Sequence, residues 1–251
     1  MSTALNDQPV LSTFNLPDAT REHGLLSVLN HVTDATPQWI YSGLNVEAIC
    51  GGVGTSTAFC IDDTETPEEK TPFTGEWSHL TPFAVYALHE CSSVGKPRDE
   101  RATDALAALN LGEQTALEGQ FATLALNDVD LQSETATDLV DALALADSLL
   151  GYEAGRVVHL NPSDVTRLAG KGVLKKSDSG LRTYNGTPVV SGLGYPSDLG
   201  VLVTGPVLGA ICEAFTTETV LERLTNLLSV LAEKPWALGY ACGATQITVS
   251  P

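Results

Sequence analysis

The apolar and polar positions of this 251-residue chain fall into segments of different period. Two segments, Trp39 to Cys60 and Trp77 to Cys91, alternate as half-buried strands do. Between them, residues 61–76 contain six acids, one lysine and two prolines. Such a composition has little apolar surface to fold around. The pattern predicts a long β-hairpin with a polar, extended tip.

Apolar residues with helical spacing follow the hairpin. Pro97 can start a helix, and the apolar stripe runs down to Leu126, which makes this the longest helix expected in the chain. Gly112 and Gly119 lie on one side of it and predict close backbone approach, because each costs about 1 kcal/mol against alanine. A second helix is expected from Ser133 to Leu150.

The second half of the chain reads as a mixture of strands with one helix. The stretch RVVHLNPSDVTRLAGKG, residues 156–172, predicts a buried strand that runs into a helix capped by Asn161, with Pro162 at its first position and Asp164 at its third. Turn signals follow at Asn185-Gly186 and Gly194-Tyr195-Pro196. GVLVTG, residues 207–215 and the closing stretch through Val249 read as sheet.

Composition and charge limit the function. Apolar residues make up 43% of the chain, which indicates a globular protein, and no run of eighteen apolar residues or signal-peptide pattern predicts a membrane partner or export. The formal net charge of −18 argues against a dominant nucleic-acid-binding surface, because such binding requires basic residues to neutralise phosphates.

Candidate chemistry consists of single residues. His159 ends a buried strand and could act as a base, but a histidine satisfied by backbone partners is the commoner case. Glu113 interrupts an apolar stripe, where a structural ion pair is expected. The turn before Pro162 lacks a glycine-rich phosphate motif, and Ser56 lacks the G-x-S-x-G elbow. We therefore expect no catalytic, metal or cofactor-binding residues.

The five cysteines include no C-x-x-C pair, so thiols of a cytosolic protein are expected. His89 and Cys91 on one strand face, joined by Cys50 or Cys60 across the hairpin, are the alternative as metal ligands. Small buried apolar residues are a further interpretation of the same cysteines.

The order of these segments resembles the major capsid protein of tailed bacteriophages, whose Hong Kong ninety-seven type of fold is also used by encapsulins. RVVHLNPSDVTRLAGKGVL, TYNGTPVV, GYP, VLVTGPV and LLSVLAEKPWALGYACGATQITV carry most of the likeness. PFAVYALHECSSVG before a long helix resembles an actinobacterial-phage branch. The resemblance implies an α+β capsid fold with an N-terminal arm, an extended hairpin loop, a peripheral domain with a long spine helix, and an axial domain.

By this resemblance the chain divides into an arm (1–38), the extended loop (39–95), the spine helix of the peripheral domain (96–130), the axial domain (131–205), a peripheral return (206–236) and an axial closing strand (237–251). It implies a non-enzymatic subunit that assembles with itself, as pentamers and hexamers, into an icosahedral virion shell in the host cytoplasm. The shell encloses double-stranded DNA without binding it specifically. Portal, scaffolding or decoration proteins are the other partners implied. An encapsulin-like compartment and an α/β enzyme that uses His159 remain the alternatives.

Contacts between subunits are expected at the hairpin tip, because its acids repel one another and need an outside surface. The candidate contact residues are Asp62, Glu65, Glu68, Lys70, Phe73 and Trp77. Some members of the fold join a loop lysine to a neighbour's asparagine, here Lys70 and Asn226. A reaction of this kind also needs a desolvated carboxylate, so no cross-link is expected.

Overall fold

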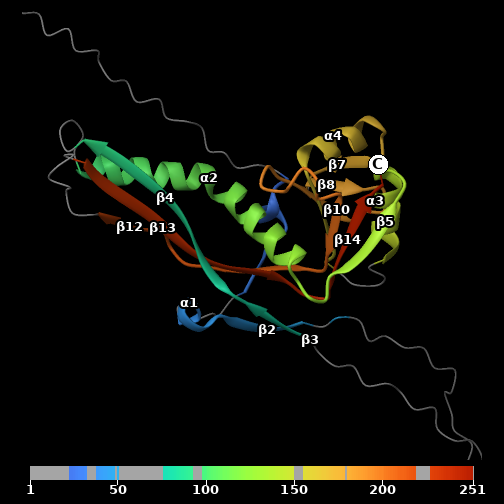
Figure 1. Ribbon diagram of the computed structural model, residues 1–251, viewed down its shortest axis with the longest axis horizontal. Helices are drawn as coiled ribbons and strands as arrows, with labels where there is room; N and C mark the ends of the chain where they lie inside the picture. The colour runs from blue at the N-terminus through green and yellow to red at the C-terminus, as the bar shows by residue number, and fades with distance from the viewer. Residues whose placement is uncertain are drawn as a thin grey trace, which may run out of the picture.

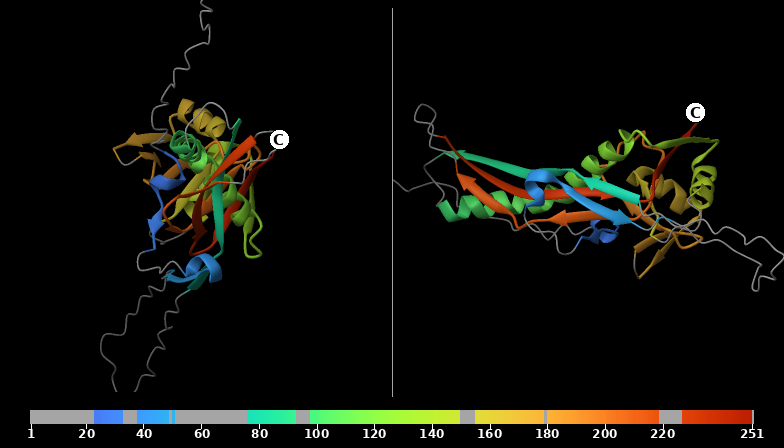
Figure 2. Two further views of the ribbon diagram at one scale, coloured as in Figure 1. Left: turned by 90° about the vertical axis from the view of Figure 1, so that its left-hand side faces the viewer. Right: turned by 90° about the horizontal axis from the view of Figure 1, so that it is seen from below.

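The computed structural model describes residues 23–32, 38–48, 50, 76–92, 98–149, 155–178, 180–218 and 227–250. Figure 1 shows an elongated molecule in which a long helix runs beside long strands and ends at a compact lobe. Figure 2 shows the same length from below, with the lobe at one end. Within the described residues, no helix is both long and apolar enough to span a bilayer.

The long part of the molecule is a five-stranded sheet covered by one helix. The helix α2 (Arg98–Leu126) packs its apolar stripe, including Ala105 and Leu109, against the sheet. The sheet has the order β1-β11-β13-β12, with β4 also paired to β13; its strands are β1 (Asn30–His31), β4 (Pro82–Ser92), β11 (Val207–Ile211), β12 (Phe215–Glu218) and β13 (Leu227–Tyr240).

The pairing of β4 with β13 extends antiparallel from Leu227↔Ser92 to Ala237↔Pro82. Alternate residues of β4, such as Val85 and Ala87, face α2, because successive strand residues point to opposite faces. The strand and the long helix predicted here from period alone are both confirmed.

The compact lobe contains a seven-stranded sheet of order β5-β14-β10-β6-β9-β8-β7. Its strands are β5 (Gln132–Ala136), β6 (Val157–Leu160), β7 (Leu174–Ser177), β8 (Gly180–Thr183), β9 (Pro188–Ser191), β10 (Val201–Thr204) and β14 (Ala244–Val249). Two helices, α3 (Leu139–Leu149) and α4 (Pro162–Gly170), share an apolar core with one face of this sheet.

The other face of the seven-stranded sheet packs against the second half of α2. Along β6, Val157 belongs to the core that contains Phe121 of α2, whereas Val158 and Leu160 belong to the core of α3 and α4. Every residue of β6 and β10 is buried, because the central strands are covered on both faces. The helix α2 therefore joins the two parts of the molecule through one continuous core.

The predicted hairpin is present at its base. β2 (Leu44–Ala48) and β3 (Glu76–Leu80) pair antiparallel from Leu44↔Leu80 to Ala48↔Glu76. The segment before β2 was expected as strand, but Trp39–Ser42 forms the one-turn helix α1. Trp39 is buried there against Leu80 and Ala237, so tertiary packing prevails over strand propensity.

The second helix begins later than its pattern suggests. Residues Gln132–Ala136 form the strand β5, which pairs parallel with β14. The helix α3 starts after Asp138, whose carboxylate accepts hydrogen bonds from the backbone N–H groups of Val140 and Asp141. The expectation for residues 133–136 was wrong because their strand partner lies more than a hundred residues away.

The expectation for the α2 glycines holds at one position. The carbonyl oxygen of Gly194 lies 3.5 Å from where a Cβ of Gly119 would stand, so the loop before β10 packs closely on the helix. A Cβ on Gly112 would meet nothing within 4 Å, so close approach was wrong there. The 3-10 helix η1 (Leu25–Ser27), near the start of the described chain, also packs on α2 through Leu25.

Candidate assembly surfaces

His159 is fully buried between the seven-stranded sheet and α2. Its Nδ1 lies 2.9 Å from the Tyr195 hydroxyl, and its Nε2 lies 2.9 Å from the Thr204 hydroxyl. The ring also lies 4.9 Å from the Phe121 ring, centroid to centroid. The sequence suggested backbone partners, but the structure satisfies both ring nitrogens with side-chain hydroxyls instead.

The hydroxyl of Thr204 donates its proton to the Gly205 carbonyl, so its oxygen accepts from His159 Nε2–H. Nδ1 then accepts from Tyr195, whose pKa burial raises well above its usual value. Burial lowers the pKa of His159 to about 3, which keeps the imidazole neutral. A base enclosed and paired in this way has no free nitrogen for a substrate, so the arrangement supports a structural role.

Glu113 forms the buried ion pair expected for it. Its Oε1 lies 2.7 Å from Lys234 Nζ and accepts a hydrogen bond of 2.8 Å from Trp236 Nε1. Lys234 and Trp236 belong to β13, so one carboxylate of α2 fixes the long helix to the long strand. The ion pair and the hydrogen bond of Glu113 therefore fix the position of α2 on the sheet.

The start of α4 is closed by the chain itself, as predicted. Asn161 caps the helix by accepting from the Ser163 backbone N–H, and its amide donates to the Tyr195 carbonyl. Pro162 occupies the first position and Asp164 lies in the first turn, where it is buried. This helix end therefore offers little room for an anion.

The base of the hairpin is fixed to the rest of the molecule twice. Trp39 and Leu80 pack with Ala210 and Ala237 of the long sheet. Cys50, just beyond β2, forms a disulfide with Cys242 in the turn between β13 and β14.

The thiol expectation was therefore wrong for Cys50 and Cys242. The two residues are 192 positions apart in sequence, so spacing gave no sign of the pair. The metal alternative fails for Cys50, whose sulfur is bonded. His89 instead pairs with Asp104 at 3.8 Å, and the described residues contain no group of three or more metal-ligating side chains. Cys60 lies outside the described residues, and Cys212 has a half-buried free thiol.

Of the six predicted contact residues, the structure describes Trp77. Its side chain is 66% exposed on β3, and Tyr41 of α1 is 91% exposed. Both side chains leave apolar surface accessible close to the base of the hairpin. Asp62, Glu65, Glu68, Lys70 and Phe73 lie outside the described residues, as does the pair Lys70 and Asn226.

A second apolar surface lies on the face of the long sheet opposite α2. Tyr86 pairs with Glu233 and Leu88 with Leu231, and Phe215 of β12 pairs with Glu233 from the other side. Tyr86, Leu88 and Phe215 are all exposed, so β4 and β12 present large apolar side chains on this face, on either side of Glu233 of β13. This surface was not predicted from the sequence, although β4 carries apolar residues on both of its faces.

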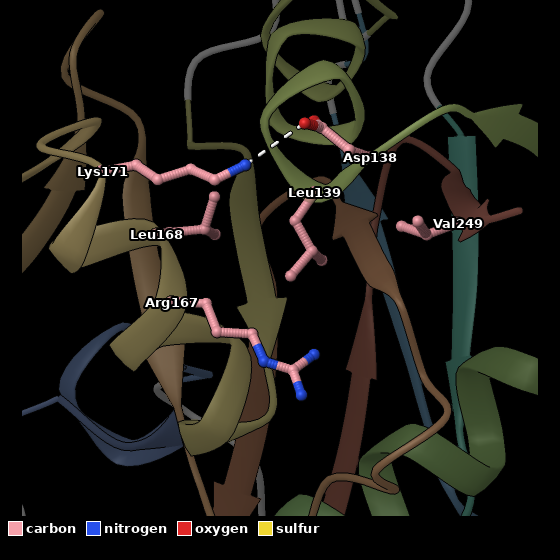
Figure 3. A pocket seen from close by; sticks show the side chains of 6 residues that line it. All are labelled: Asp138, Leu139, Arg167, Leu168, Lys171 and Val249. Atoms are coloured by element: carbon pink, nitrogen blue, oxygen red, sulfur yellow. Dashed lines mark hydrogen bonds and ion pairs between the residues drawn. The ribbon is translucent and has the colours of Figure 1, made fainter. Parts of the chain in front are cut away.

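The lobe also has a surface hollow of about 300 Å³ between α3 and α4, shown in Figure 3. Leu139, Leu168 and Val249 line it, and Lys171 Nζ pairs with Asp138 Oδ2 at 3.2 Å across its edge. Arg167 points from α4 over the hollow. Its charged lining residues are therefore Arg167 and the ion pair of Asp138 with Lys171, in which each charge neutralises the other.

Comparison with known proteins gives structural relatives alone. No family model matches the chain, and no curated protein matches its sequence. The capsid of a native GTA particle is similar with a TM-score of 0.59 at 11% identity, over 96% of this chain and 95% of that one. A chain of Microbacterium phage Oxtober96 matches with a TM-score of 0.55 at 12% identity, over 98% and 96%. A virus-like particle from Pyrococcus furiosus matches with a TM-score of 0.52 at 8% identity, over 90% and 92%.

These likenesses extend over nearly the whole of each chain. The helix α2, the long strands, the hairpin base and the lobe thus form one fold, that of phage capsid chains. The resemblance seen in the sequence is confirmed at the level of fold.

Proposed function

We propose that this protein is the structural subunit of a tailed-phage capsid, which assembles with itself into an icosahedral shell around double-stranded DNA. The observation that carries the proposal is the end-to-end match to the capsid of the native GTA particle. Because both chains are covered almost completely, the likeness includes the extended parts of the molecule as well as its lobe.

The surfaces of the molecule support assembly. Large apolar side chains are exposed on this acidic protein at two places. They are Trp77 and Tyr41 near the hairpin base, and Tyr86, Leu88 and Phe215 on the long sheet. Burial of such surface against other copies is favourable at about 25 cal/mol per Å². The net charge of −18 suits a wall that repels enclosed DNA and leaves it free to move.

The proposed role requires no chemistry from the chain. His159 is enclosed, Glu113 holds two elements together, and in the hollow beside α4 the charges of Asp138 and Lys171 are paired with each other. The proposed partners are further copies in pentamers and hexamers, in a virion assembled in the host cytoplasm. Portal, scaffolding and decoration proteins complete this proposal.

The test is electron microscopy of the purified protein after expression alone and with its neighbouring genes. Closed shells or rings of five and six subunits are expected. A chain that stays a 26.4 kDa monomer at high concentration under all conditions would contradict the proposal.

The similarity to the Pyrococcus furiosus virus-like particle gives an encapsulin-like compartment as a second candidate. The contents of the particles separate the two functions. Nuclease-protected double-stranded DNA of uniform length supports a phage capsid. Particles filled with one protein and free of DNA would support the compartment.

A further inference from the structure

The turn between β13 and β14 lies where the chain passes from the long sheet into the lobe. The chain passes between the same two sheets from β10 to β11. The two passages are hydrogen-bonded to each other, from Ala241 N–H to the Pro206 carbonyl and from Gly205 N–H to the Gly243 carbonyl, each at 3.1 Å. A Cβ on Gly205 would lie 2.0 Å from the Ala241 carbonyl oxygen, so the contact is close. The turn is therefore held firmly in the body of the subunit.

Cys242 has an unfavourable backbone conformation in this turn. Its φ is 63°, and within the described part of the chain it is the one residue other than glycine with a positive φ. Glycine normally occupies this left-handed region, because a Cβ is crowded there. Strain that the surrounding structure maintains points to a function of the residue. The disulfide from Cys242 to Cys50 gives the reason for a cysteine at this position.

The disulfide and the apolar cluster hold opposite ends of the β2–β3 pair. Among the described strands, β2 and β3 pair only with each other, and Figure 1 shows them below the long sheet. Trp39 and Leu80 pack on the long sheet at the end where Leu44 pairs with Leu80. Cys50 lies beyond the other end, where Ala48 pairs with Glu76. Without the disulfide, the packing against the long sheet acts at one end of the pair.

A two-stranded pair held at one end has little to keep its direction. Two isolated strands are marginally stable in water, so their position depends on what attaches them to the rest of the protein. Residues 44 to 50 span about 20 Å when extended at about 3.3 Å per residue. A small rotation at the Leu44 and Leu80 end therefore moves the Cys50 end by several ångströms.

We propose that the Cys50–Cys242 bond is a redox switch that determines whether the β2–β3 pair is held at one end or at both. As thiols, the two cysteines leave the pair free to change its direction relative to the body. As a disulfide, they fix this direction. The inference rests on the proposed function, in which the chain assembles in a reducing cytoplasm and the finished particle leaves it. The adjustable form serves assembly, and the fixed form serves the released particle.

The chemical step is thiol–disulfide exchange with a small-molecule disulfide, such as oxidised glutathione. The thiolate of Cys50 attacks one sulfur of this disulfide and releases one glutathione thiolate, and Cys242 then attacks the mixed disulfide and releases the second. The two cysteines lose two electrons and two protons, and one oxidised glutathione becomes two glutathione thiols. Cys50 is the first to react because it is half-buried, whereas Cys242 is 9% exposed.

Hydrogen exchange on dissociated subunits of the full chain tests the switch without requiring a shell. Peptides that cover β2 and β3 are followed by mass spectrometry in oxidised glutathione and in dithiothreitol. Their amides should exchange about tenfold faster or more in the reduced protein, because local opening is then easier. The helix α3 in the lobe is the internal control and should exchange equally in both. Equal exchange of β2 and β3 in the two redox forms would overturn the inference.

Cys242→Gly and Cys242→Ser remove the bond in different ways. Glycine adopts a φ of 63° without strain, whereas serine keeps a Cβ there. Both variants should show the fast exchange of the reduced protein with or without dithiothreitol. Because glycine relieves the strain of the turn, fast exchange in Cys242→Gly is due to the missing bond. Slow exchange in this variant would overturn the inference, since packing alone would then hold the pair.

Cys212→Ser is the matched control, because Cys212 is a half-buried free thiol that packs against the same cluster. It should respond to dithiothreitol as the unaltered protein does. A non-reducing gel shows the redox state of each sample, since a chain with a closed loop migrates faster than an open one.

Assembly from dissociated subunits tests the use of the switch. Reduced subunits should form particles in severalfold higher yield than subunits oxidised beforehand. Particles assembled from reduced subunits and then treated with oxidised glutathione should resist urea better than Cys242→Gly particles treated alike. Equal yields, or equal resistance, would overturn the assigned use. Failure of the unaltered protein to form particles in either redox state would instead contradict the proposed function, while the exchange experiment still decides on the switch.

Discussion

At the scale of single residues, the buried polar groups of this protein connect helices and strands to one another. His159, Glu113 and Asn161 each join elements that are distant in sequence, and each is satisfied by hydrogen bonds or an ion pair. The sequence indicated that these residues were special but not which partners they have. Tyr195, Thr204 and Lys234 are brought to them only by the tertiary fold.

The buried histidine predicts a pH dependence of stability. The folded protein holds the pKa of His159 at about 3, whereas an unfolded chain has a histidine pKa of about 6.5. The unfolded state therefore binds the extra proton first as pH falls, so stability present above pH 6.5 is lost between about 6.5 and 3. From pH 6.5 to 4.5 the loss amounts to about 2 to 3 kcal/mol.

His159→Gln should remove this part of the pH dependence, although it lowers stability at pH 7. Urea denaturation of dissociated subunits at several pH values measures the slope for both proteins. His31→Gln, at an exposed position, is the control. Equal slopes in His159→Gln and the unaltered protein would show that His159 does not hold a depressed pKa.

The ion pair between α2 and β13 predicts that Glu113 and Lys234 are coupled in their contributions to stability, which a single substitution cannot show. Glu113→Gln leaves the mostly buried Lys234 ammonium without a counter-charge and should cost about 2 to 4 kcal/mol. Lys234→Met should cost a similar amount, because Glu113 is left with the Trp236 N–H alone. The double variant should be less destabilised than the sum, and denaturation of all four proteins measures the difference. Additive losses would mean that the pair contributes nothing as a pair.

At the scale of elements, the period of apolar residues predicted an element correctly where that element packs through one continuous apolar stripe or through every second residue. The helix α2 and the strands β4 and β13 follow their patterns closely. Prediction failed for β5, which is a strand because β14 lies beside it, and for α1, which is a helix because Trp39 has a pocket among distant residues. The disulfide belongs with these failures, since its cysteines meet only after the whole sheet has formed.

The disulfide at the hairpin base predicts a redox dependence. Protein purified without reductant should contain Cys50 and Cys242 as a bonded pair in peptide mass spectra, and reduction should lower the thermal midpoint. Constraint of so long a loop is worth about 2 to 5 kcal/mol in the unfolded state. The proposed function places assembly in a reducing cytoplasm, where cysteines are usually thiols, so we expect the bond to form after the particle leaves the cell.

Cys242→Ser should reproduce the reduced midpoint and no longer respond to reductant. Cys212→Ser, which removes the half-buried free thiol, should behave as the unaltered protein. A midpoint that reductant leaves unchanged in the unaltered protein would mean that the hairpin base is held by the packing of Trp39 and Leu80 alone.

At the scale of the whole molecule, the fold combines a body built on one continuous core with a hairpin base attached to it. One core runs from the long sheet through α2 into the lobe, whereas the hairpin base is attached by a small cluster and one disulfide. Contacts inside the body therefore fix the shape of a subunit. Contacts made by the hairpin are suited to fix how subunits join, and the exposed Trp77 beside its base agrees with this division.

This division predicts the effect of removing the hairpin tip. Replacement of Asp62 to Glu76 by an Asn-Gly turn removes six acids and Lys70 but leaves the disulfide and the Trp39 cluster in place. The variant should fold with unchanged helix content, because the helices α1 to α4 and the core residues of the described part of the chain all lie outside the removed segment. It should remain soluble and fail to close shells, because each exposed ion pair of about 1 kcal/mol or less is repeated over every subunit. Sedimentation and microscopy distinguish unassembled subunits and rings from closed particles. A control variant keeps the length of the tip but has its acids changed to Gln or Asn, which separates the effect of lost charge from the effect of lost length. Shells of ordinary size and stability from the shortened chain would show that the tip plays no part in assembly.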